Sequence, residues 1–382
     1  MIKQVIDTER VPIKLWLDDI EEGALQQARN LANLPFVYKW VAIMPDSHQG
    51  YGMPIGGVLA TQGVIVPNAV GVDIGCGMTA VKTSLTEIDT ETLKRVMGKI
   101  REVIPVGFSH QVENQAWDGF DDAPDIPVIQ RELASAKKQL GTLGGGNHFI
   151  EIQRGDDDHI WIMIHSGSRN FGLKTADEYH KKAQLLCTKW HSFIPDKDLA
   201  FLPIDDNAGN EYYRAMNYCL NFAKANRALM MNRALSTLYS ETGAIWLEGI
   251  NIHHNYAAFE HHYGKDVLVH RKGATKATLG LTGIIPGSMG SSSYITEGLG
   301  NPESFCSSSH GAGRRMGRKE AERMLNLEAE QEKMAGIVHG LRSKNELDEA
   351  PGAYKNIDVV MKNQSDLTKI LVTLKPLANI KG

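Results

Sequence analysis

The sequence lacks any long apolar run, and none of its hydrophobic stretches approaches the roughly 20 residues that a membrane-spanning helix needs. Residues 1–19 carry too many charges for a signal peptide. The chain also lacks a disulfide framework, because its four cysteines are scattered without a regular spacing. We therefore expect a cytoplasmic protein with reduced cysteines and no membrane partner.

An excess of basic residues is missing as well. The formal net charge is −4 over 382 residues, so any binding of nucleic acid must depend on a local basic patch. The densest such cluster contains Arg314, Arg315, Arg318 and Lys319. Repeats and low-complexity linkers are also missing, which favours one compact domain over residues 1–382.

Glycine, in contrast, is abundant, with 37 residues that cluster at 50–77, 141–146 and 280–317. Such clusters predict tight loops between regular elements. Apolar periodicity predicts an α+β protein in which mixed sheets are flanked by helices. We expect helices in 20–34, 86–103, 128–140, 174–193 and 208–240, and strands in 37–44, 57–81 (two runs around Pro67), 148–153, 159–165, 244–253 and 266–270.

Polar residues follow several of these predicted strands. Asp46 and His48 begin a glycine-rich loop after strand 37–44, where a simple capping turn is the alternative to a functional site. Asp73 and Cys76 lie three positions apart among glycines, so that both side chains could reach one metal ion. The alternative for Cys76 is inert packing in the core.

Histidines in comparable positions favour the metal. His148 lies where a glycine loop enters a strand, and His165 ends a buried apolar strand before a Gly/Ser/Arg loop. His253 and His254 are adjacent, and neighbouring side chains on a strand face opposite ways. One of these two histidines should therefore face the same cavity.

A further histidine, His310, stands alone within the segment CSSSHGAGRR. Small residues on both sides allow a large ligand to approach the imidazole, and nearby hydroxyl and guanidinium groups suit a phosphate. The Gly/Ser loop at 280–301 offers backbone N–H groups that could cradle a phosphate or a ribose. An incidental histidine in a mobile loop is the alternative.

Three histidines, a thiolate and a carboxylate are too many for one tetrahedral structural zinc. They suit either one open catalytic site or two adjacent ions that share the cysteine. Imidazole and thiolate accept Zn, Fe, Co or Mn, so ligand softness does not choose the metal. The residues alone predict a metal-dependent enzyme that acts on phosphates.

Ten motifs, in order from about residue 44 to the end of the chain, resemble the RtcB family of RNA ligases. They are MPDSHQGYGMPIGG, GVDIGCG, LGGGNHFIE, HSGSRNFG, HHNY, RKGA, GIIPGSMG, ESFCSSSHGAGR, EAPGAYKNID and the closing IKG. The pair GVDIGCG and SHGAGR is the most specific. The resemblance implies the RtcB-type fold with a deep metal- and nucleotide-binding cleft.

It also implies a GTP- and Mn²⁺-dependent ligase, with two Mn²⁺ ions, that joins RNA 2′,3′-cyclic phosphate or 3′-phosphate ends to 5′-hydroxyl ends in RNA repair or tRNA splicing. An accessory activator protein is a possible further partner. His310 would carry the covalent GMP, from which an RNA(3′)pp(5′)G intermediate forms. The implied metal ligands are Asp73, Cys76, His148, His165 and His254, and the implied nucleotide contacts are Asn147, Glu151, Pro286, Gly287, Ser288, Met289, Gly290, Ser309, Gly311, Ala312, Gly313, Tyr354 and Lys381.

Four basic residues would neutralise RNA phosphates, namely Arg169, Arg271, Lys272 and Arg314, so activity should fall steeply with salt. The main rival is a metal-dependent RNA cyclic phosphodiesterase or hydrolase, which would need neither a nucleotide nor His310. A non-catalytic RNA-binding protein would have no use for a cluster of five ligands.

Overall fold

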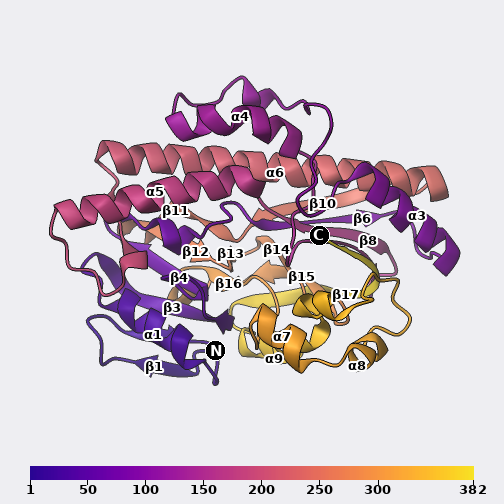
Figure 1. The fold of residues 1–382 in the computed structure, drawn as a ribbon. Helices are drawn as coiled ribbons and strands as arrows, with labels where there is room; N and C mark the ends of the chain where they lie inside the picture. The colour runs from indigo at the N-terminus through magenta and orange to yellow at the C-terminus, as the bar shows by residue number, and fades with distance from the viewer.

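Two large β-sheets form the framework of the computed structural model, which describes residues 1–382 (Figure 1). The first has six strands in the order β1-β2-β3-β4-β12-β11, and only the β2–β3 pair is parallel. Its strands are β1 (Gln4–Ile6), β2 (Ile13–Leu15), β3 (Val37–His48), β4 (Ile55–Thr61), β11 (Asn255–His262) and β12 (Lys265–Lys272).

The second sheet has seven antiparallel strands in the order β10-β6-β8-β7-β17-β15-β14. Its two end strands, β10 and β14, contact each other, so the sheet curls almost into a barrel. Its strands are β6 (Gly77–Thr83), β7 (Phe149–Gly155), β8 (Ile160–Ser166), β10 (Trp246–His253), β14 (Thr282–Ile285), β15 (Ser293–Gly298) and β17 (Thr368–Lys381).

Two short ribbons join distant segments. One pairs β13 (Ala274–Lys276) with β16 (Ser307–Ser309), and the other pairs β5 (Val64–Ile65) with β9 (Leu202–Pro203). The first ribbon matters for the site because it fixes the residue before His310. Ser309 is paired with Ala274, directly beyond the end of β12.

Helices cover the sheets, and the longest of them spans both (Figure 1). The first half of α6 packs Tyr212 and Phe222 against α4 and α5, while its second half packs Met230 and Leu238 against the seven-stranded sheet and α3. The helices are α1 (Glu22–Ala32), α2 (Pro67–Val70), α3 (Thr90–Val103), α4 (Pro127–Gln139), α5 (Arg169–Lys189), α6 (Asn207–Thr242), α7 (Arg318–Met324), α8 (Leu327–Glu332) and α9 (Ile357–Asn363).

The α+β prediction is confirmed, and the differences are local. Pro67 starts the short helix α2 instead of interrupting a strand, because its fixed φ suits the first helical position. β3 continues to His48, so Asp46 lies on the strand and not in the following loop. None of the helices is both long and apolar enough to cross a membrane.

Candidate active site

A cavity of about 800 Å³ lies where the two large sheets meet, and residues from both sheets line it. His48 comes from the six-stranded sheet, whereas His165 and Lys381 come from the seven-stranded sheet. The lining also includes Asp73, Cys76, His254 and His310. Residues that are far apart in sequence thus share one chamber.

Cys76, His148 and His165 form a buried cluster whose potential ligand atoms all lie within 4.8 Å of one another. The Cys76 Sγ is 3.4 Å from the His148 Nε2 and 3.2 Å from the His165 Nε2. The pairing of β6, β7 and β8 explains this proximity. His165 pairs with Met78 on one side and with Phe149 on the other, so Cys76, two residues before Met78, and His148, directly before Phe149, reach the same point.

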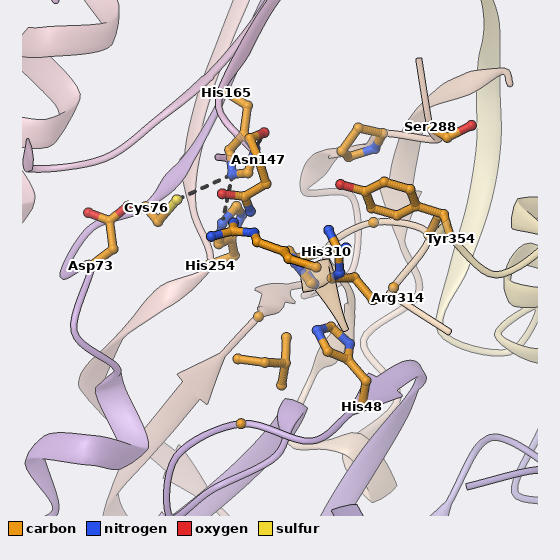
Figure 2. Close-up of a pocket in the computed structure, with 18 of the residues that line it drawn as sticks. His48, Asp73, Cys76, Asn147, His165, His254, Ser288, His310, Arg314 and Tyr354 are labelled. Carbon is orange, nitrogen blue, oxygen red and sulfur yellow. Dashed lines mark hydrogen bonds between the residues drawn. The ribbon is translucent and has the colours of Figure 1, made fainter. Parts of the chain in front are cut away.

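Asp73 and His254 extend this cluster at its two ends. The Asp73 Oδ2 is 3.1 Å from the His148 Nε2, and the His254 Nε2 is 3.3 Å from the His165 Nε2. His254 occupies the single position between β10 and β11, where the chain passes from one large sheet to the other. The five side chains therefore form a continuous row, which we call the ligand row. Figure 2 labels Asp73, Cys76, His165 and His254.

The chemistry of the ligand row fits a cation. His165 donates its Nδ1 proton to the Asn147 carbonyl at 3.0 Å, which leaves a lone pair on the Nε2 that faces Cys76. Burial, together with His148 and His310, lowers the pKa of His165 well below its usual value, so the imidazole is neutral. The Asp73 Oδ1 is buried without a hydrogen-bond donor. These converging acceptors suit a metal ion.

The same environment is poor for a metal-free thiolate. Burial and the neighbouring Asp73 carboxylate raise the pKa of Cys76 well above its ordinary value. A bound divalent cation would reverse this preference, because it stabilises the deprotonated sulfur. Of the two adjacent histidines, His254 faces the cavity, whereas the His253 Nδ1 lies 3.1 Å from the Gly75 carbonyl and from the Arg227 guanidinium.

His310 lies beside the ligand row and is held from the other side by Asp46. Its ring centroid is 4.7 Å from that of His254, and its Nδ1 is 2.6 Å from the Asp46 Oδ2. The same carboxylate oxygen accepts the His310 backbone N–H at 3.1 Å. Because the Nδ1 proton points to a carboxylate, the Nε2 keeps a free lone pair.

The expected nucleotide contacts mostly line this cavity, and Figure 2 shows His310 between the ligand row and the pair Ser288 and Tyr354. Gly290 and Ser309 do not line it. Gly290 packs near Pro351, and the buried Ser309 bonds to Gln364 beneath the cavity. The lining members of the predicted set are Asn147, Glu151, Pro286, Gly287, Ser288, Met289, Gly311, Ala312, Gly313, Tyr354 and Lys381.

The buried Glu349 carboxylate connects Arg314, Tyr354 and Lys381, which form the wall of the cavity opposite the ligand row. Glu349 accepts a hydrogen bond from the Tyr354 hydroxyl, pairs with Arg314 at 2.9 Å, and lies 3.5 Å from the Lys381 Nζ. In the same region, burial raises the pKa of Glu151 to about 7, although Lys381 opposes this shift. This wall therefore presents the hydrogen-bond donors Arg314 and Lys381, together with the Glu151 carboxyl group, which is partly protonated near pH 7.

The structure corrects one of the predicted RNA contacts. Arg271 is completely buried and forms two hydrogen bonds with Glu260, so its guanidinium supports the fold and does not reach the cavity. Lys272 does line the cavity, and burial lowers its pKa to about 7. The Arg314 guanidinium also borders the cavity, whereas Arg169 bonds to Thr142 and to the Gly107 carbonyl.

Sequence reasoning undervalued Asp46. Its side chain is 0% exposed and its partner His310 lies 264 positions away, so no local spacing connects the two. The only signal was a carboxylate beside a histidine at the end of a strand. His48 lines the cavity nearby, and burial lowers its pKa to about 4, so it is neutral at pH 7.

Comparison with known proteins assigns the family. A family model described as tRNA-splicing ligase RtcB matches residues 27–382. The RNA-splicing ligase RtcB of Escherichia coli (strain K12) is 38% identical over 409 residues, covering 99% of this chain and 99% of the relative. The tRNA-splicing ligases RtcB of Pyrobaculum aerophilum and Thermococcus kodakarensis are 32% and 31% identical, and each alignment covers 98% of this chain and 95% of the relative. The chain belongs to the RtcB family.

Proposed function

We propose that this chain is a cytoplasmic RNA ligase that joins RNA 2′,3′-cyclic phosphate or 3′-phosphate ends to 5′-hydroxyl ends. The reaction uses GTP and two Mn²⁺ ions, and it serves RNA repair or tRNA splicing. The relatives' names as RNA- and tRNA-splicing ligases support the reaction class. An accessory activator protein stays a prediction.

The observation that carries this proposal is the environment of His310. Its Nδ1 is engaged by Asp46, so its free Nε2 is a nucleophile inside a chamber large enough for a nucleotide. Attack of this nitrogen on the α-phosphorus of GTP forms a P–N bond, while the bond to the leaving pyrophosphate breaks. The Asp46 carboxylate keeps the Nδ1 proton in place and stabilises the positive charge that develops on the ring.

The later steps return the histidine to its starting state. The RNA 3′-phosphate attacks the guanylate phosphorus, which breaks the P–N bond and yields RNA(3′)pp(5′)G. The 5′-hydroxyl of the second RNA end then attacks the RNA phosphorus, forms the phosphodiester and releases GMP. A cyclic end must first be opened by water to give the 3′-phosphate.

The ligand row would hold the metal. Asp73, Cys76, His148, His165 and His254 would hold the ions, because their acceptor atoms follow one another at 3.1–3.4 Å along the row. When bound, the ions supply Lewis-acid stabilisation of the charge on the transferring phosphoryl group. Burial lowers the pKa of both His165 and His254, and these two neutral imidazoles with the fixed His165 tautomer prepare this arrangement.

Labelling with α-³²P-GTP and Mn²⁺ on a denaturing gel tests the covalent step. We expect label on the wild type and on His261→Ala, an exposed histidine outside the cavity, but none on His310→Ala. Label on His310→Ala would overturn the assignment of the nucleophile. If no protein is labelled although metal binds, and a cyclic-phosphate RNA end is still opened, the chain is a hydrolase.

A further inference from the structure

The ligand row is backed by a buried arginine on α6 to which the reaction above gives no role. Arg227 is 0% exposed and lies in the middle of the helix, where α6 crosses β6, β8 and β10 (Figure 1). It has no carboxylate partner within salt-bridge distance. Burying a guanidinium without a carboxylate partner is costly, so its position behind the ligand row indicates a role other than stability.

The hydrogen bonds of Arg227 go to the neighbours of three metal ligands. Its Nη1 donates to the Gly75 carbonyl at 2.8 Å and to the Ser166 carbonyl at 2.9 Å. Its Nη2 donates to the His253 Nδ1 at 3.1 Å. These three partners directly precede Cys76, follow His165 and precede His254, respectively.

The orientation of this side chain is itself fixed. The Asn251 Oδ1 accepts the Arg227 Nε–H at 2.9 Å. The adjacent Asn226 accepts the backbone N–H groups of Gly141 and Thr142 and donates to the Gly167 carbonyl. One turn of α6 thus connects the three segments that carry Cys76, His165 and His254 and anchors them to the Gly141–Thr142 turn.

We propose that Arg227 is a positioning residue for the metal centre: its planar guanidinium fixes the backbone beside Cys76 and His165 and the His253 side chain beside His254, and so prearranges these ligands for the ions. The inference rests on the proposed metal centre. The guanidinium bonds four acceptors at once through donors in a fixed planar fork, whereas an ammonium has only three donors, which rotate at the end of a flexible stem. Groups that orient ligands from behind affect metal affinity by roughly 10–100-fold.

Two substitutions separate geometry from charge. Arg227→Met removes both the fork and the charge, whereas Arg227→Lys keeps the charge and loses the fork. We expect both to raise the Mn²⁺ dissociation constant, measured by titration calorimetry without nucleotide, by roughly 10–100-fold. GTP labelling of His310 should need correspondingly more Mn²⁺ but approach its wild-type extent when Mn²⁺ is saturating.

Arg233→Met is the matched control, because Arg233 also lies on α6 and bonds to the Gly141 carbonyl and to Gln115, away from the three ligands' neighbours. It should leave the Mn²⁺ affinity unchanged.

Wild-type affinity in Arg227→Lys or in folded Arg227→Met would overturn the proposal. If Arg227→Met does not fold, Asn251→Ala decides, since it frees the Nε and otherwise removes only an exposed hydrogen bond to the Lys224 carbonyl. A weakened Mn²⁺ affinity supports the proposal and an unchanged one overturns it. Failure of the wild type itself to bind Mn²⁺ would instead refute the proposed metal centre.

Discussion

The smallest unit of the site is the pair formed by Asp46 and His310. The carboxylate accepts both the ring Nδ1–H and the backbone N–H of His310, so it fixes the tautomer, the ring and the backbone at once. The other carboxylate oxygen, Oδ1, is buried without a hydrogen-bond partner. Leaving a buried carboxylate oxygen without a donor is unfavourable, and this oxygen lies beside the nucleophile.

We expect Asp46→Asn to slow labelling of His310 by GTP by roughly 10²–10⁴-fold, because an amide can hold the wrong tautomer and cannot balance a charged imidazole. Single-turnover labelling rates measure the effect. Asp266→Asn is the control, since Asp266 pairs with His261 at 2.8 Å in an equivalent but exposed arrangement. Equal rates for Asp46→Asn and wild type would contradict the role assigned to Asp46.

At the scale of elements, the approach of β12 to the β13–β16 ribbon sets the position of His310. Gly273 links β12 to β13 with φ +61°, a conformation in the left-handed region. A Cβ at this position would lie 2.3 Å from the Ile55 Cγ2 and 3.0 Å from the His310 Cε1. A side chain at position 273 would therefore displace the His310 imidazole from its position beside Asp46.

Gly273→Ala should reduce His310 labelling by about 10²-fold, the cost of misplacing a reacting group by roughly 1 Å. Mn²⁺ affinity should stay near the wild-type value, because the ligand row comes from other elements. Gly264→Ala is the matched control at the opposite end of β12: its φ is +79° but no atom lies within 4 Å of the added Cβ. Loss of labelling in both variants would point to backbone strain and not to the collision.

At the scale of the whole molecule, the cavity gathers four basic side chains in a chain whose net charge is −4. Lys272, Arg314, Arg318 and Lys381 all line it. Four acidic residues also line the cavity, namely Glu21, Asp73, Glu151 and Glu320, so the attraction for RNA should be confined to the basic side chains and screened by salt. Glu349 partly neutralises the cluster, because it bonds to Arg314 and Arg318.

RNA joining should therefore weaken steeply as salt increases. In a plot of log affinity for RNA against log salt concentration, we expect Arg318→Ala to reduce the slope by about 0.7, the value for one phosphate contact on a single strand. Arg131→Ala, an exposed arginine on α4 outside the cavity, should leave the slope unchanged. A flat salt response in the wild type would argue against RNA binding at this wall.

Local sequence accounted for much of the fold and the ligand row. Alternating and helical patterns located most strands and helices, although Pro67 and the end of β3 were misread because turn and strand signals overlap there. Cysteine and histidine at strand ends predicted a metal cluster. Cys76, His148 and His165 do converge, because their strands are neighbours in one sheet.

The sequence by itself determined which residue types can do the chemistry, since a ligand or a nucleophile is a property of a side chain. Only the tertiary structure decided how these groups are held. Asp46 meets His310 across 264 positions, Arg227 reaches Gly75 across 152, and Arg271 is withdrawn from the cavity by Glu260. Such contacts arise when two sheets and a long helix pack together, and no local pattern along the chain encodes that packing.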